Sequence, residues 1–145
     1  VKRRFEIKYK SPSFVHIDDF AHHPDELRRS IESVRMLYAD RRMVTVFQPH
    51  LYSRTQDFAK EFAEVLSIPD EPILLPIYPA REKPIPGVTS EYLLSLIERE
   101  NKCVLQKHEL TAYLQANKPD VLLTIGAGDI DRLVVPIAEM LKKRV

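Results

Sequence analysis

Short apolar runs alternate along most of the chain with stretches in which apolar residues recur every three or four positions. The short runs are typical of strands, and the longer spacing is typical of a helix with one buried face. Strands are predicted over 4–9, 14–18, 43–47, 73–78, 103–105 and 121–125. Helices are predicted from Pro24, near Ser53, over 91–100, over about 109–116 and after Asp129. This alternation favours an α/β domain whose sheet is mostly parallel and covered by helices on both faces.

The first two predicted strands are separated only by the turn Lys10-Ser11-Pro12-Ser13. A connection this short predicts a hairpin, in which the first strand runs antiparallel to its neighbour. The basic run Val1-Lys2-Arg3-Arg4 leads straight into that strand, which is typical of a piece cut from a longer protein. A natural chain start is the alternative.

Two prolines fall inside predicted elements. Pro76 cannot donate to a β-ladder, so strand 73–78 should lie at an edge, carry a bulge or end early. Pro136 removes the bond to the carbonyl of Arg132, so the last helix should bend there. The segment 79–88 is the longest irregular stretch, and its Arg81-Glu82-Lys83 cluster suits either a function or a solvated surface.

Composition places limits on function. The 145 residues make one domain, 1–145, with a formal net charge of +1 and no run of five like charges. No nucleic-acid or membrane partner is therefore expected, and no apolar run approaches the ~20 residues of a membrane helix. The only cysteine, Cys103, is expected to be a buried strand thiol. Without a possible intrachain disulfide, the cytoplasm is the expected location.

Polar side chains gather where two predicted strands end. Asp18-Asp19-Phe20-Ala21-His22-His23 follows the second strand, and Gln48-Pro49-His50-Leu51-Tyr52-Ser53-Arg54-Thr55 follows the third. In an open α/β sheet, ligands bind in the crevice beyond the carboxyl ends of the strands. These turns are therefore candidate sites, although polar loops that cap helices would have the same composition. Ser53 or Thr55 is expected to cap the following helix.

The residue types in these turns indicate what could bind. A guanidinium and imidazoles close together, as Arg54, His50 and His22 would be, can hold a carboxylate. A carboxylate at a strand tip, such as Asp18, can accept hydrogen bonds from ribose hydroxyls. An amino acid and one flank of a nucleotide are therefore the candidate ligands.

Other motifs are weaker. Gly126 and Gly128 follow the last strand and suit either a tight turn or an anion site, but no complete dinucleotide fingerprint or P-loop is present. The five histidines show no HxxxH or HExxH spacing, so no metal is expected. No Gly-x-Ser-x-Gly elbow supports a serine nucleophile.

Four segments stand in the order and spacing of one known domain: 18–24, 48–55, the pair 78–80 with 84–87, and 126–130. Over essentially the whole chain this pattern resembles the C-terminal domain of the Mur ligase family. Within the family it is similar to the ligases that add L-alanine to UDP-N-acetylmuramate in peptidoglycan synthesis. The second segment separates these from the related ligase that recycles murein tripeptide.

The resemblance implies a Rossmann-like domain that closes over a central ATPase domain and delivers the amino acid. ATP would phosphorylate the UDP-muramic acid carboxylate, and the amine of L-alanine would displace phosphate. ATP, Mg²⁺ and the UDP-sugar would be bound mainly by two domains that this chain does not contain, so the chain alone should be inactive. By position, Asp18 matches a residue that contacts the ribose, whereas His22, His50 and Arg54 match residues around the bound alanine.

Two positions depart from the family pattern. Phe20 stands where many members have tyrosine, and Leu51 where many have arginine. Both replacements remove a polar group, which leaves Arg54 as the expected anchor of the carboxylate. The alternatives are a free-standing Rossmann-like module that binds a small anion without catalysis, or the domain of the tripeptide-recycling ligase.

Overall fold

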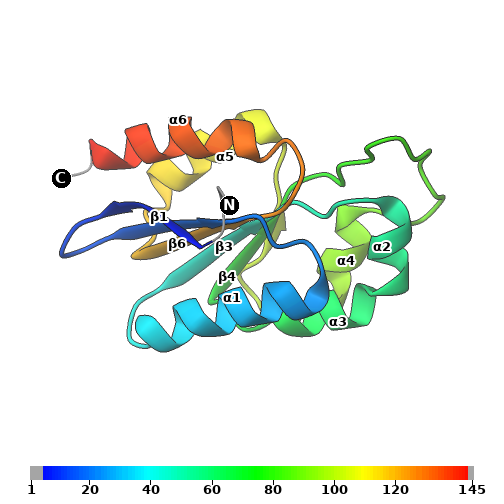
Figure 1. The fold of residues 1–145 in the computed structure, drawn as a ribbon, viewed down its shortest axis with the longest axis horizontal. Helices are drawn as coiled ribbons and strands as arrows, with labels where there is room; N and C mark the ends of the chain where they lie inside the picture. The colour runs from blue at the N-terminus through cyan, green and yellow to red at the C-terminus, as the bar shows by residue number, and fades with distance from the viewer. Residues whose placement is uncertain (1–4, 144–145) are drawn as a thin grey trace.

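The computed structural model describes residues 5–143, which form a six-stranded sheet between two layers of helices (Figure 1). The strand order is β1-β2-β6-β3-β4-β5. Only β1 pairs antiparallel with its neighbour, and the other four pairings are parallel. The strands are β1 Glu6–Lys10, β2 Val15–Asp19, β3 Met43–Phe47, β4 Glu71–Leu74, β5 Cys103–Val104 and β6 Val121–Ile125. The predicted α/β class, the strand count and the antiparallel edge strand are confirmed.

Helices cover both faces of the sheet. They are α1 Pro24–Leu37, α2 Tyr52–Asp57, α3 Ala59–Leu66, α4 Ser90–Leu96, α5 Lys107–Ala116 and α6 Asp131–Lys142. Figure 1 shows α5 and α6 on one face and α1, α3 and α4 on the other. Each layer closes its own apolar core. One core contains Leu27, Ile31 and Phe62 under α1 and α3, and the other contains Leu110, Ile137 and Leu141 under α5 and α6.

The register of the central strands brings their carboxyl ends to one edge of the sheet. Asp19 and Phe47 both lie opposite Ile125, and Phe47 also lies opposite Leu74. The loops after β2, β3, β4 and β6 therefore leave the sheet side by side. This edge is the crevice at which parallel α/β sheets bind ligands.

Some strand boundaries differ from the sequence prediction. The first strand begins at Glu6 rather than residue 4, and residues 1–4 lie outside the part that is described. The fourth strand begins at Glu71 and ends at Leu74, before Pro76. The early end was one of three outcomes expected for a proline that cannot donate to the ladder.

The predicted helix after Ser53 is in fact two helices. It breaks at Phe58, which ends α2 and begins α3 and is 40 % exposed. Ser53 and Thr55 do not cap α2, because the N-cap is Leu51. Helix α4 is also shorter than predicted, since it ends at Leu96, whose side chain is exposed rather than buried.

Cys103 is only half-buried, because it lies on the two-residue edge strand β5. The expectation of a buried thiol is therefore wrong.

Among residues 5–143, none of the helices combines the length and the apolar character needed to cross a membrane.

Candidate functional site

The turn between β2 and α1 holds a carboxylate against the first turn of the helix. Pro24 occupies the first helical position, and Glu26 Oε1 accepts the backbone N–H groups of His22 (3.3 Å) and His23 (3.2 Å). Burial opposes the charged carboxylate, but these two hydrogen bonds and the nearby imidazoles outweigh burial and hold the pKa of Glu26 below its ordinary value. The turn is therefore closed by these two hydrogen bonds and carries a negative charge at neutral pH.

His22 is oriented by the same turn. Its Nδ1 lies 3.2 Å from the carbonyl oxygen of Phe20 and 3.9 Å from Glu26 Oε1. The ring also packs edge-on against Phe20, with centroids 5.4 Å apart. One hydrogen-bond acceptor, a nearby carboxylate and one aromatic ring thus set the direction of this imidazole.

The turn after β3 supplies the second half of the site. Leu51 has a φ of 75°, an uncommon conformation for a residue with a side chain, and it turns the chain from His50 into α2. One helical turn later, Arg54 Nη1 donates to His50 Nδ1 at 3.0 Å. Partial burial and the Arg54 guanidinium lower the pKa of His50, so this imidazole is neutral.

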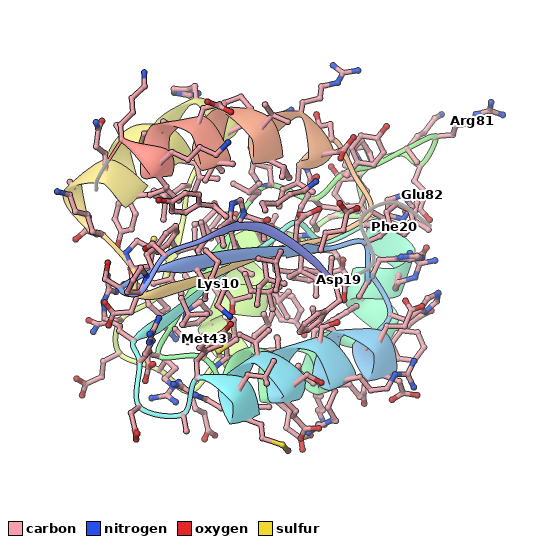
Figure 2. The ribbon with its side chains drawn as sticks, turned by 60° about the vertical axis from the view of Figure 1, so that its left-hand side comes forward. Lys10, Asp19, Phe20, Met43, Arg81 and Glu82 are labelled. Carbon is pink, nitrogen blue, oxygen red and sulfur yellow. The ribbon has the colours of Figure 1, made fainter. Side chains whose placement is uncertain are left out.

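The loop after β4 supports this turn from a third strand end. Tyr78 forms an isolated parallel bridge with His50, and the two rings stack with centroids 5.6 Å apart. Further along, Glu82 accepts both the backbone N–H of Ser53 (3.1 Å) and its hydroxyl. Arg81, beside it, points away into solvent, whereas Glu82, Phe20 and Asp19 lie at one end of the sheet in Figure 2.

The two turns meet at the crevice. The His22 and His50 rings lie edge to face with centroids 5.7 Å apart, although they are 28 positions apart in the chain. The structure therefore brings together His22, His50 and Arg54, as the sequence suggested. The Nη2 and Nε groups of Arg54 make no hydrogen bond within residues 5–143, so one edge of its fork is available to a carboxylate.

Asp18 does not lie where the sequence placed it. Strand β2 continues to Asp19, so Asp18 is not the strand tip, and its side chain is fully buried. Its Oδ1 accepts the hydroxyl of Thr124 on β6 at 2.8 Å. Because the residue has no exposed surface, a ribose hydroxyl does not reach it in this arrangement.

Gly126 and Gly128 have a packing role that favours the tight-turn interpretation over the anion site. A Cβ at Gly126, which has a φ of +144°, would lie 2.9 Å from the carbonyl oxygen of Gln48. At Gly128 it would overlap the Gln48 side chain and come within 2.7 Å of Tyr78 Cβ. The loop therefore needs glycine because Gln48 and Tyr78 fill the space beneath it.

Gln48 explains how this loop is held. Its Oε1 accepts the N–H of Ile130 at 2.8 Å, and its Nε2 donates to Asp129 Oδ1, also at 2.8 Å. Asp129 in turn forms an ion pair with Lys107 at the start of α5. One buried amide thus joins the end of β3 to the start of α6.

Sequence reasoning gave no individual role to Gln48, Tyr78 or Glu82. Gln48 and Tyr78 were part of the motifs without a role of their own, and Glu82 was part of a charged cluster of undecided role. The available signal was their position next to strand ends. Their partners are distant in the chain, and residue type alone does not reveal them.

A magnesium site is not formed by these residues. Within the described range 5–143, no three His, Cys, Asp or Glu side chains are grouped so that they could hold a metal ion. The acidic groups of the site are instead engaged with backbone N–H groups or hydroxyls.

The sequence matches a known family over most of its length. The family described as "Mur ligase, glutamate ligase domain" matches residues 3–128. The UDP-N-acetylmuramate--L-alanine ligase of Porphyromonas gingivalis is 54% identical over 141 residues, which cover 97% of this chain and 31% of the relative. The ligase of the same name from Cytophaga hutchinsonii is 51% identical over 144 residues, 99% of this chain and 31% of the relative. The chain thus spans about a third of the length of these curated relatives.

Solved structures share the fold. The UDP-N-acetylmuramate-alanine ligase of Thermotoga maritima superposes with a TM-score of 0.75 at 24% identity, over 100% of this chain and 31% of that one. A murein peptide ligase from Psychrobacter arcticus gives 0.73 at 19% identity, over 97% and 30%. These values establish a common fold without separating the two activities. With the family matched over 3–128, the chain belongs to the Mur ligase family, as its C-terminal domain.

Proposed function

We propose that this domain delivers L-alanine in an ATP-dependent ligase that joins the amino acid to UDP-N-acetylmuramate. The observation that carries the proposal is the Arg54–His50 pair, which lies beside His22 at the carboxyl edge of the sheet. The names of the curated relatives, at 51% and 54% identity, support L-alanine as the amino acid.

Arg54 is the proposed anchor of the alanine carboxylate. The methyl group of alanine offers under about 1 kcal/mol of burial, so the carboxylate must provide most of the directional binding. The free edge of the Arg54 fork can donate hydrogen bonds to this carboxylate, while His50 and Glu82 hold the segment around Arg54 in place. Phe20 and Leu51 contribute no polar group to this contact.

The remaining substrates belong to the rest of the proposed ligase. ATP, Mg²⁺ and UDP-N-acetylmuramate would be held mainly by domains outside this chain, which would close over the carboxyl edge of the sheet. A nucleotide contact by Asp18 would first require this buried carboxylate to become exposed. A location in the cytoplasm stays a prediction.

The test is Arg54→Lys in the full-length ligase. Lysine keeps the charge but loses the planar fork, so the KM for L-alanine should rise roughly tenfold and kcat should fall, with the KM for ATP little changed. Steady-state kinetics with each substrate varied in turn measures this.

The matched control is Arg81→Lys, because Arg81 is an exposed arginine on the neighbouring loop. It should leave both KM values unchanged. Alanine kinetics that are unaltered by Arg54→Lys would move the carboxylate site away from Arg54 and refute the assignment.

A further inference from the structure

The partners of His22 and His50 determine which nitrogen of each neutral ring carries the proton. A carbonyl oxygen can only accept a hydrogen bond, and an arginine can only donate one. Each ring has such a partner on Nδ1, and the two partners are of opposite kinds. The two tautomers are therefore opposite.

His22 Nδ1 faces the Phe20 carbonyl oxygen at 3.2 Å and the Glu26 carboxylate at 3.9 Å, so Nδ1 carries the hydrogen. The lone pair of the neutral ring is then on Nε2. No hydrogen bond to this Nε2 is made from any residue between 5 and 143, and the side chain is 22% exposed. His22 thus keeps one unoccupied proton acceptor, Nε2, among the described residues.

His50 has the reverse arrangement. Its Nδ1 accepts from Arg54 Nη1 at 3.0 Å, so the hydrogen of the neutral ring is on Nε2. His50 can therefore donate a hydrogen bond through Nε2 but cannot accept a proton there. His50 and the free edge of Arg54, which are joined through Nδ1 and Nη1, thus each keep a donor.

A free amino acid matches this pair, because it carries a carboxylate that needs donors and an ammonium that needs an acceptor. We infer that His22 is a catalytic base that takes a proton from the ammonium of the incoming amino acid, while His50 donates to its carboxylate together with Arg54. This inference rests on the proposed function and adds the group that makes the amine nucleophilic.

The proton transfer is balanced as follows. An N–H bond of the ammonium breaks and an Nε2–H bond forms, which leaves a lone pair on the amine and a positive charge on His22. The amine then forms the C–N bond to the acyl phosphate carbon, and the C–O bond to phosphate breaks. As the amide forms, its nitrogen loses one more proton, which leaves with the phosphate. His22 then releases to solvent the proton that it took.

Charges around His22 fit this role. On α1, Glu26 stands behind Nδ1 and stabilises the imidazolium, as the third member of a nucleophile–base–carboxylate arrangement does. His23 lies 4.9 Å away between ring centroids and His50 lies 5.7 Å away. Arg54 and Glu82, one positive and one negative, act in opposite directions on the pKa of His50. Glu26 therefore places a carboxylate beside Nδ1, and leaves Nε2 to the substrate.

The tautomers can be tested without activity. In this chain labelled with ¹⁵N-histidine, long-range ¹H–¹⁵N spectra above the titration range should show a bare nitrogen at Nε2 of His22 and at Nδ1 of His50. The opposite assignment for His22 would overturn the inference.

The catalytic role requires the full-length ligase. His22→Gln keeps an acceptor near Nε2 but cannot take a proton, so kcat should fall on the order of a hundredfold, with a smaller change in the KM for L-alanine. The acidic limb of the kcat–pH profile should move to higher pH, because activity then recovers only as rising pH supplies free amine. His108→Gln, at an exposed histidine on α5, is the control and should behave like the parent.

The outcomes separate this inference from the function on which it rests. If Arg54→Lys raises the KM for L-alanine while His22→Gln changes only KM and leaves the acidic limb at the pH of the parent, the base role is wrong and the alanine site stands. If Arg54→Lys has no effect on alanine kinetics, the proposed site itself fails.

Discussion

His16 is a histidine in the middle of the sheet, and its burial has a cost that depends on pH. Its side chain is fully buried on β2, Nε2 lies 3.0 Å from Thr124 Oγ1, and Nδ1 has no hydrogen-bond partner within residues 5–143. Burial, aided by the nearby Lys8, lowers the pKa of His16 from 6.5 to about 3. The folded protein therefore holds this ring neutral at mildly acidic pH.

We predict that His16 makes the fold sensitive to acid. Between its unfolded pKa of 6.5 and its folded pKa of about 3, the unfolded chain binds the extra proton, so stability falls as pH is lowered through this window. Between about pH 7 and about pH 5, the free energy of unfolding should drop by about 2 kcal/mol through this residue. Urea unfolding of the parent and of His16→Gln measures the difference.

The comparison has a built-in control. His16→Gln keeps a donor toward Thr124 but does not titrate, so it should lose less stability on acidification than the parent. His108→Gln removes an exposed histidine and should follow the parent. Parallel pH dependences for His16→Gln and the parent would show that His16 does not bind the proton on unfolding.

Single residues also show where sequence reasoning reaches its limit. Asp18 was assigned from residue type to a ribose contact, yet it is fully buried beside Thr124, as is His16. A polar residue on a strand is buried or exposed according to what covers that face of the sheet. Here β6, β2 and the helices above them determine that these side chains are buried, and the local sequence pattern does not reveal it.

Helix α6 carries a proline inside its span. Pro136 was expected to interrupt the hydrogen bond to the carbonyl of Arg132, and the helix continues from Asp131 to Lys142 around it. Val134, Ile137 and Leu141 are buried on either side, which anchors the helix by packing despite the missing bond. The expected bend stays a prediction.

We predict that Pro136→Ala stabilises the domain. The side chain is exposed, so alanine removes no buried contact while it restores a backbone donor. Proline costs about 3 kcal/mol in a helix interior, offset in part by its effect on the unfolded chain, so a gain of about 1 to 2 kcal/mol is expected. Thermal unfolding measures it, and a lower midpoint would mean that the ring packs favourably where it is.

The break between α2 and α3 shows why helix boundaries were less predictable than helix positions. The sequence predicted one helix near Ser53, and α3 forms its second part, Ala59–Leu66. The start of α2 is instead set by the positive φ of Leu51 and by Glu82, which binds Ser53 from another loop. A contact from 29 positions away cannot be read from the local period.

For the whole domain, the prediction concerns what it does alone. The loop at 126–130, which could have held an anion, is filled by Gln48 and Tyr78, and no P-loop occurs in the sequence. We expect the chain to unfold cooperatively but not to hydrolyse ATP or bind it better than roughly millimolar. Calorimetric titration with ATP tests this, and micromolar binding would place a phosphate site inside this domain.

The sequence by itself determined the types of element and their order, because apolar spacing depends only on neighbours in the chain. It also placed polar residues at the ends of β2 and β3, and four spaced motifs identified the family. The tertiary structure alone decided that the His22 and His50 rings lie 5.7 Å apart, that Asp18 is buried, and that Gln48 and Glu82 support the site. Each of these depends on strand register and on loops from distant segments, and such contacts form only when the sheet has assembled.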